Sequence, residues 1–119
     1  PSVAGVTGVA DEDVLVFTPS ALGATTAGTW ALHFDGSDVG VGDATTEDID
    51  AVALDPQGRM YFSTSAGFIA PGASGADEDI GRFAGAFGAT TTGVFGLIFD
   101  LSTLGVAAGA DVDGLAFAP

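Results

Sequence analysis

Short groups of acidic residues are the part of this sequence with the clearest potential for chemistry. Three consecutive acids stand before an apolar residue at positions 11–13 and again at 77–79, and two further groups occupy 47–50 and 111–113. Ca²⁺ binds about 6–8 oxygen ligands, which clustered carboxylates and backbone carbonyls supply. The sequence therefore predicts calcium sites with these candidate ligands: Asp11, Glu12, Asp13, Glu47, Asp48, Asp50, Asp77, Glu78, Asp79, Asp111 and Asp113.

The same acids have a structural alternative. Acidic side chains at turns accept hydrogen bonds from nearby backbone N–H groups, and charges at sheet edges discourage unwanted strand pairing. The loop after Phe34 is not an EF-hand calcium loop. Val39 and Thr46 occupy positions 5 and 12 of such a loop, where an EF-hand has oxygen ligands for the metal. Both interpretations of the acidic groups remain open at this point.

Net charge excludes several classes of partner. The 119 residues include 16 Asp and Glu against two Arg and no Lys, which gives a formal net charge of −14. Phosphate backbones and anionic lipid headgroups repel such a chain, so we expect no nucleic-acid partner. No run approaches the roughly 18 apolar residues that span a bilayer, so we expect no membrane insertion.

Composition favours an exported protein. Cys and Asn are both absent, which removes disulfides, thiol chemistry and acceptors for N-glycosylation. A chain rich in Gly, Ala, Thr and Asp without Lys is typical of abundant bacterial exported proteins, so we expect an extracellular or cell-surface location. The chain as given contains no secretory signal, which would place basic residues before an apolar stretch.

The sequence repeats itself with a period of about 65 residues. Residues 11–14 match 77–80 at an offset of 66, and residues 23–26 match 88–91 at an offset of 65. The dipeptide Phe-Asp at position 34 recurs with the same offset of 65, and residues 48–50 recur with an offset of 63. The offset changes in stretches rich in Gly, Thr and Asp, where loop insertions are expected. The chain therefore contains two copies of one unit.

Each copy is predicted to consist of short strands. Pro56 and Gly58 predict a tight hairpin turn, since Pro presets φ and Gly accepts a positive φ. Apolar residues do not recur at helical spacing, and Gly and Thr oppose long helices, so the predicted fold class is all-β. The predicted strands are residues 14–17 and 29–34 in the first copy and residues 49–54, 60–64, 80–83 and 94–99 in the second.

Some of these strands are apolar on both faces. Residues 94–99 show no alternation of polar and apolar positions, which indicates a sheet that is covered on both sides. Trp30 aligns with Phe95 of this strand, so we expect Trp30 in the core, together with Tyr61 and Phe62.

Residues 51–62 resemble the inner hairpin of NHL-like β-propeller blades, and residues 23–30 and 34–38 look like a blade repeat of large bacterial exported and surface proteins. The resemblance implies two four-stranded β-propeller-type blades, circularly offset so that blades are completed between chains or by neighbouring repeats. The single module, residues 1–119, then divides into the end of one blade (1–48), a full blade (49–99) and the start of the next (100–119). On this alignment, residues 2–6 are the tail of a second strand and residues 112–117 a first strand.

Two blades do not close a ring, because propellers typically have about 4–8 blades. Open sheet edges are templates for pairing with another chain. We expect a non-enzymatic structural or adhesive repeat that self-associates into a homo-oligomeric ring or a filament, with Ca²⁺ as its expected cofactor. The alternative is a lectin-like propeller that binds a glycan or a small ligand.

Catalysis is not expected from these residues. His33 is the sole histidine and aligns with Ile98, so its predicted role is packing between blades. A Gly-x-Ser-x-Gly nucleophile motif is absent, and carboxylates are too abundant for any pair of them to indicate a glycosidase. Arg59 and Arg82 are expected to pair with carboxylates.

Overall fold

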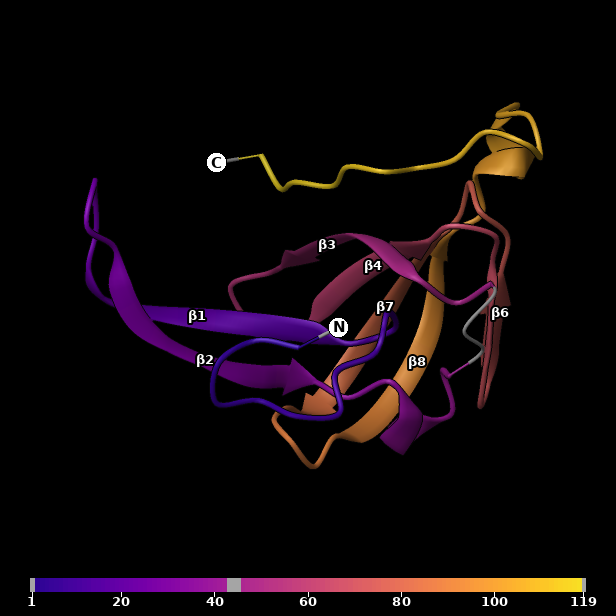
Figure 1. Ribbon diagram of the computed structural model, residues 1–119. Helices are drawn as coiled ribbons and strands as arrows, with labels where there is room; N and C mark the ends of the chain where they lie inside the picture. The colour runs from indigo at the N-terminus through magenta and orange to yellow at the C-terminus, as the bar shows by residue number, and fades with distance from the viewer. Residues whose placement is uncertain (1, 43–45, 119) are drawn as a thin grey trace.

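The chain has an all-β fold, which confirms the predicted class. The computed structural model describes residues 2–42 and 46–118. Its strands are β1 (Val14–Ala21), β2 (Ala27–Phe34), β3 (Ile49–Leu54), β4 (Met60–Thr64), β5 (Phe68–Ala70), β6 (Ala73–Gly75), β7 (Ile80–Ala86) and β8 (Thr92–Phe99). The largest sheet is antiparallel with the order β3-β4-β7-β8, while β1 pairs with β2 and β5 pairs with β6 (Figure 1). Short 3₁₀ helices, η1 (Ser37–Val39) and η2 (Leu101–Leu104), follow β2 and β8.

The four-stranded sheet forms the body of the molecule, and two segments flank it. Figure 1 shows the β1–β2 hairpin reaching out on one side of this sheet, while the C-terminal segment runs along the other side. Within the described ranges, no helix is long and apolar enough to cross a membrane.

Six of the eight predicted strand segments are present. The bounds of β3 and β4 agree with the prediction, and β1, β2, β7 and β8 are each two to four residues longer than predicted. The β5–β6 hairpin between β4 and β7 has no counterpart in the sequence prediction. Its strands of three residues each, separated by Pro71 and Gly72, are too short to show a periodic pattern.

Two predicted strand segments are wrong. Residues 112–117 run along the sheet without forming a strand, and residues 2–6 contain an isolated bridge between Val3 and Val6 instead of a strand. A strand is stabilised by a ladder of hydrogen bonds to a neighbour. Neither segment has such a ladder in the part of the chain that the structure describes.

The turn between β3 and β4 has the predicted chemistry. Gly58 adopts a φ of 78°, and its N–H donates to the carbonyl of Asp55 at 2.9 Å. The Asp55 carboxylate accepts from the N–H groups of Gln57 and Arg59 and from Nε of Arg59, the last at 2.6 Å. Burial acts to raise the pKa of Asp55, but these hydrogen bonds and the Arg59 charge outweigh burial and hold the pKa below its usual range. Arg59 thus pairs with a carboxylate, as expected.

Aromatic side chains build the core on one face of the large sheet. The rings of Phe34 and Phe83 meet edge to face with centroids 5.1 Å apart, and those of Phe62 and Phe68 do so at 5.0 Å. Gly81 of β7 makes room for this packing, because a Cβ there would lie 2.6 Å from the Phe62 ring. The buried residues of the core cluster are Phe34, Val41, Met60, Phe62, Phe68, Ala70 and Phe83.

Large apolar side chains remain exposed outside this core, contrary to the expectation of strands covered on both sides. In β8, Val94 is 71% exposed and Phe99 is 51% exposed. The prediction of a buried Trp30 is also wrong: Trp30 is 40% exposed and packs against Phe17 with ring centroids 4.9 Å apart. The physical reason is that the β1–β2 hairpin projects from the body, so that only its base reaches the core, at Phe34.

Candidate functional site

The last acid of each three-acid group links two loops. Asp13 accepts hydrogen bonds from the N–H groups of Ala10 at 2.8 Å and Gly36 at 3.0 Å. Asp79, at the equivalent position of the second copy, accepts from the N–H group three residues earlier and from that of Leu101, both at 3.0 Å. Each carboxylate holds the start of a strand against the loop that follows the next strand of the hairpin. These two acids therefore have the structural role that was the alternative to metal binding.

The first acid of each group marks the junction between successive units. The N–H of Ile49 donates to the carbonyl of Asp11 at 3.1 Å, and the N–H of Val112 donates to the carbonyl of Asp77 at 3.3 Å. Beside the first junction, the backbone carbonyl of Asp48 accepts a hydrogen bond from the N–H of the residue that follows β4. The same backbone hydrogen bond thus occurs in both copies, and in each it places the start of the next unit.

Four of the predicted metal ligands come together at the second junction. Desolvation raises the pKa of Asp111, although this residue is exposed, and so do the charge of Asp50, a hydrogen bond shared with Asp50, and the charges of Asp77 and Asp113. Asp50 also accepts from the hydroxyl of Ser63 at 2.7 Å. These four carboxylates, hereafter the junction acids, come from β3, the loop before β7 and the C-terminal segment.

The middle acid of each three-acid group is buried. Glu12 is 6% exposed and Glu78 is 2% exposed, although carboxylates seldom lie inside a protein. Burial raises the pKa of Glu12, and the neighbouring charges of Asp13 and Asp11 act in the same direction, opposed by a backbone hydrogen bond. Among the described residues, Oε2 of Glu78 has no hydrogen-bond partner. The sequence alone does not show which acids of each group are buried.

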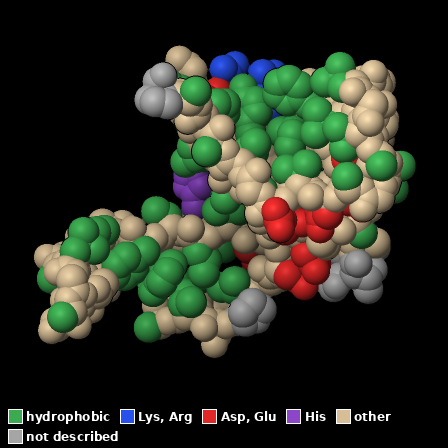
Figure 2. Space-filling view, turned by 90° about the horizontal axis from the view of Figure 1, so that it is seen from above, with side chains coloured by type: hydrophobic (Ala, Val, Ile, Leu, Met, Phe, Trp, Pro, Cys, Tyr) green, Lys and Arg blue, Asp and Glu red, His purple; other side chains and the backbone are tan. Residues whose placement is uncertain are grey.

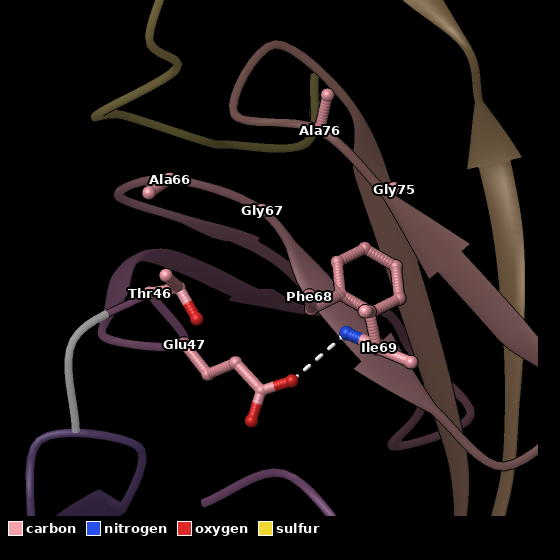
Figure 3. Close-up of a pocket in the computed structure, with 8 residues that line it drawn as sticks. All are labelled: Thr46, Glu47, Ala66, Gly67, Phe68, Ile69, Gly75 and Ala76. Carbon is pink, nitrogen blue, oxygen red and sulfur yellow. Dashed lines mark hydrogen bonds between the residues drawn. The ribbon is translucent and has the colours of Figure 1, made fainter. Parts of the chain in front are cut away.

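Glu47 lies at the wall of a pocket of about 400 Å³ (Figure 3). Its Oε1 accepts from the N–H of Ile69, and its Oε2 accepts from the N–H of Gly42, both at 2.8 Å. Two backbone donors therefore hold the carboxylate in one orientation. The pocket is lined by Thr46, Glu47, Ala66, Gly67, Phe68, Ile69, Gly75 and Ala76.

The acidic side chains do not form a ready-made metal site. Within residues 2–42 and 46–118, no three or more carboxylate or imidazole side chains are arranged so that they could hold a metal ion. Figure 2 shows Asp and Glu side chains gathered in one area of the face that it displays, with hydrophobic side chains spread over much of the rest. The structure thus brings several predicted ligands into one region without assembling a coordination shell.

An apolar groove between the β1–β2 hairpin and β3 has no counterpart in the sequence prediction. It has a volume of about 270 Å³ and is lined by Val14, Leu15, Val16, His33, Val52, Ala53 and Leu54. Val16 and Leu54 are 41% and 49% exposed, respectively. The apolar runs at residues 14–17 and 51–54 were the available signal, but which face lacks a cover depends on how the two segments are placed in space.

His33 has a packing role in this region. Its ring stacks on Phe87 with centroids 4.6 Å apart and an interplanar angle of 9°. Burial lowers the pKa of His33 below its ordinary value of 6.5. This environment agrees with the alignment of His33 with Ile98.

We expect His33→Ile to remove a loss of stability that the native protein shows in mild acid. The unfolded chain takes up a proton on His33 near pH 6.5, whereas the folded chain does so at a lower pH, so acid favours unfolding over this interval. Melting temperatures measured between pH 7.5 and 5 should fall more steeply for the native chain than for the variant. Parallel curves would contradict a neutral, half-buried His33 in the folded chain.

Comparison of the chain with models of known protein families, with curated proteins and with solved structures gives no match.

Proposed function

We propose that this chain is a non-enzymatic structural or adhesive repeat, built from propeller-type blades, that self-associates through its open sheet edges. Residues 49–99 would form one full blade, residues 1–48 the end of the preceding blade and residues 100–119 the start of the next. An extracellular or cell-surface location in bacteria belongs to the same proposal.

The observation that carries this proposal is the repeated junction. Ile49 and Val112 make the same backbone hydrogen bond to the first acid of the preceding three-acid group. The body strand β3 therefore follows the β1–β2 hairpin in the way that the C-terminal segment follows the β7–β8 hairpin. Units joined by an identical step are suited to continue in a ring or a filament.

Exposed apolar side chains support association. Soluble monomers seldom expose large contiguous apolar patches, and such patches commonly mark interaction sites. Strand β8 lies at the edge of its sheet within the described residues and exposes Val94, Leu97 and Phe99. Burial of such side chains contributes about 25 cal/mol per Å² of apolar surface, so copies that cover these strands would gain stability.

Calcium would act at the junction acids in this proposal. Asp50, Asp111 and Asp113 belong to the segments that start two successive units, and Asp77 precedes the third strand of the full blade. A divalent cation would relieve the mutual repulsion of these carboxylates and complete its shell with carbonyls and water. Association would then become stronger in the presence of Ca²⁺.

The proposal is tested by the solution mass of the purified chain, measured by light scattering after size exclusion, with Ca²⁺ and with a chelator. A discrete trimer or tetramer supports a closed ring, and a large heterogeneous mass supports a filament. Loss of either in the chelator supports Ca²⁺ at the junction acids. A folded monomer in both buffers would overturn self-association.

A second candidate function is a lectin-like or small-ligand binding propeller. The pocket beside Glu47 favours it, because its volume of about 400 Å³ lies in the range of small-molecule sites. The Glu47 carboxylate, held by two backbone donors, supplies an acceptor of the kind that sugar hydroxyls bind. A glycan array would test this candidate, with Glu47→Gln as the matched variant that should lose any binding found.

A further inference from the structure

The pocket beside Glu47 lies where the two copies of the repeat differ in length. Residues 2–6 and 11–14 align with the second copy at offsets of 63 and 66, respectively, so the second copy is longer between them by the difference, three residues. These additional residues fall in the segment that forms the β5–β6 hairpin, which is one wall of the pocket. In the first copy, the described residues before Asp11 form an isolated bridge instead of a hairpin of strands. Among the described residues, the hairpin wall is therefore specific to the second copy.

Glu47 is a second departure from the repeat. The adjacent Asp48 recurs as Asp111 at an offset of 63, but the residue equivalent to Glu47 is Ala110. The acidic group at the start of the unit is thus repeated without the acid that faces the pocket. The acid and the hairpin wall both lie outside the pattern that the two copies share, which leaves them available for a site that the fold itself does not require.

The Glu47 carboxylate is buried and fixed at the wall of the pocket. Glu47 is 6% exposed, and its two oxygens accept from the N–H groups of Ile69 and Gly42, both at 2.8 Å (Figure 3). Hydrogen bonds from N–H groups favour the ionised form of a carboxylate. A charge held away from bulk water also acts more strongly on a neighbouring charge than one in solvent does. The pocket therefore presents a fixed negative charge.

The other walls of the pocket are uncharged and mostly apolar. Ile69 lines the pocket and is 79% exposed, and small residues form much of the remainder. A Cβ at Gly67 would lie 2.8 Å from the carbonyl oxygen of Gly75, and a Cβ at Gly75 would lie 2.7 Å from the Phe68 ring, so neither position accepts a side chain without a shift. The volume of about 400 Å³ therefore has room for a chain of several carbons beside the carboxylate.

A cation for this pocket has to come from outside the chain. The sequence contains two Arg and no Lys, and neither Arg is among the residues that line the pocket. Arg59 pairs with Asp55 at 2.6 Å, and Arg82 lies in β7 opposite Tyr61. The formal net charge of −14 attracts cations from solution. Charge complementarity thus favours a positively charged ligand over a neutral one.

An ammonium group fits this carboxylate better than a guanidinium group does. A guanidinium commonly bonds to both oxygens of a carboxylate in parallel. Each oxygen of Glu47 already accepts a backbone N–H, which works against that arrangement. An ammonium is a compact point charge on a flexible chain of carbons and needs no fixed pair of acceptors. The expected ligand is therefore an alkylammonium.

We propose that the pocket between Glu47 and the β5–β6 hairpin binds the terminal ammonium group of an aliphatic chain, such as a lysine side chain, with Glu47 as the counter-ion and Ile69 beside the carbon chain. This inference goes beyond self-association, because the chain has no lysine of its own to supply. It also differs from glycan binding, which requires no positive charge on the ligand.

An NMR titration of the full chain tests the inference, in buffer without divalent cations. Pentylammonium, which is charged at neutral pH, is compared with pentan-1-ol, which has the same carbon chain and no charge. We expect pentylammonium to shift the amide resonances of Ile69 and Gly42, whose N–H groups donate to Glu47, and to bind at least about tenfold more tightly than the alcohol. Raising NaCl from about 0.05 to 0.5 M should weaken its binding several-fold.

The same titration with Nα-acetyl-lysine amide distinguishes the two sources of an alkylammonium group. Tighter binding of this compound than of pentylammonium supports a lysine side chain of a partner polypeptide as the ligand, and weaker binding supports a small free amine. If the chain assembles into particles too large for NMR, isothermal titration calorimetry with the same ligands replaces it.

Three variants separate the charge of Glu47 from the shape of the pocket and from the overall charge. Glu47→Gln should weaken pentylammonium binding about tenfold or more, to the level of the alcohol. Ala66→Leu, at an exposed position that lines the pocket, keeps the carboxylate and should weaken binding about fivefold by filling the space. Asp100→Asn removes one charge outside the lining residues and should change binding less than about twofold. Circular dichroism confirms that each variant folds, and Ala66→Leu with the alcohol comparison carries the test if Glu47→Gln does not fold.

Equal binding of pentylammonium and pentan-1-ol would overturn the inference, as would unchanged binding to a folded Glu47→Gln variant or the absence of binding to the native chain. A neutral glycan that shifts the Ile69 and Gly42 amides, with no response to pentylammonium, would overturn it in favour of the lectin-like candidate. Light scattering reports self-association separately, so a monomeric chain that binds pentylammonium through Glu47 supports this inference and counts only against the proposed function.

Discussion

Phe83→Ala is expected to lower the free energy of unfolding by about 3–5 kcal/mol, the range for loss of a fully buried aromatic side chain. Phe83 is 0% exposed and lies among the rings of Phe34, Phe87 and Phe95, with centroid distances of 4.9 to 5.4 Å. Its removal deletes these contacts and leaves a cavity in the centre of the core, where neighbouring backbone on both sides limits collapse. Denaturant unfolding followed by circular dichroism measures the loss.

The chain supplies its own control for this experiment. Phe17→Ala changes the same residue type at the equivalent position of β1, where the ring packs against Trp30 and is only half-buried. We expect a loss of about 1 kcal/mol, since only part of the side chain leaves an apolar environment. Equal losses for the two variants would show that the core extends over β1 as it does over β7, and would contradict the described burial. If Phe83→Ala does not fold, Phe83→Leu should still cost more than Phe17→Leu.

Asp79→Ala should destabilise the fold by about 3 kcal/mol, because a buried carboxylate that accepts two backbone hydrogen bonds is lost. Asp79 is 6% exposed, and its two oxygens accept from Ala76 and Leu101, each at 3.0 Å. Both N–H groups would be left without this acceptor in loops that hold β7 and β8 in place. Asp79→Asn keeps one acceptor oxygen and should lose about half as much.

Two further variants separate the hydrogen bonds from the effect of charge. Measured with a chelator present, so that no Ca²⁺ acts at the junction acids, Asp113→Ala removes the same charge from an exposed position and should change stability by less than about 0.5 kcal/mol. Asp13→Ala removes the equivalent hydrogen bonds from the less buried first copy and should cost less than Asp79→Ala. A large effect of Asp113→Ala would mean that the overall charge, and not the geometry at Asp79, controls stability.

Local patterns were sufficient for the strands and for the turn at Gly58. Strand propensity and the turn preferences of Pro and Gly depend on neighbouring residues, so β3 and β4 agree with their predicted bounds. The β5–β6 hairpin was missed because three-residue strands carry too short a signal. Residues 112–117 have a strand-like pattern but do not pair with a neighbouring strand in the described chain, and a pattern cannot supply such a strand.

In the candidate site, local sequence patterns do not predict the role of each acid. The acids at 11–13 and 77–79 look alike in sequence, yet within each group the first marks a junction, the second is buried and the third links two loops. In the second group the third acid is buried as well. These roles depend on which backbone N–H groups and which side chains lie opposite, and those groups are far apart along the chain, as Ile49 is from Asp11 and Gly36 is from Asp13. The presence of acids in the sequence therefore predicts that they could bind cations or accept hydrogen bonds. Which hydrogen-bond donor each carboxylate meets depends on segments that are distant along the chain.

Local sequence preferences and tertiary packing thus determine different features of this protein. The all-β class, the two copies and most strands follow from short-range preferences and from the repetition of residues along the chain. The exposure of Trp30 and the space that Gly81 provides for Phe62 were decided by packing among distant segments. The physical reason is that secondary structure reflects local conformational energy, whereas burial depends on which other surface comes to lie against each face.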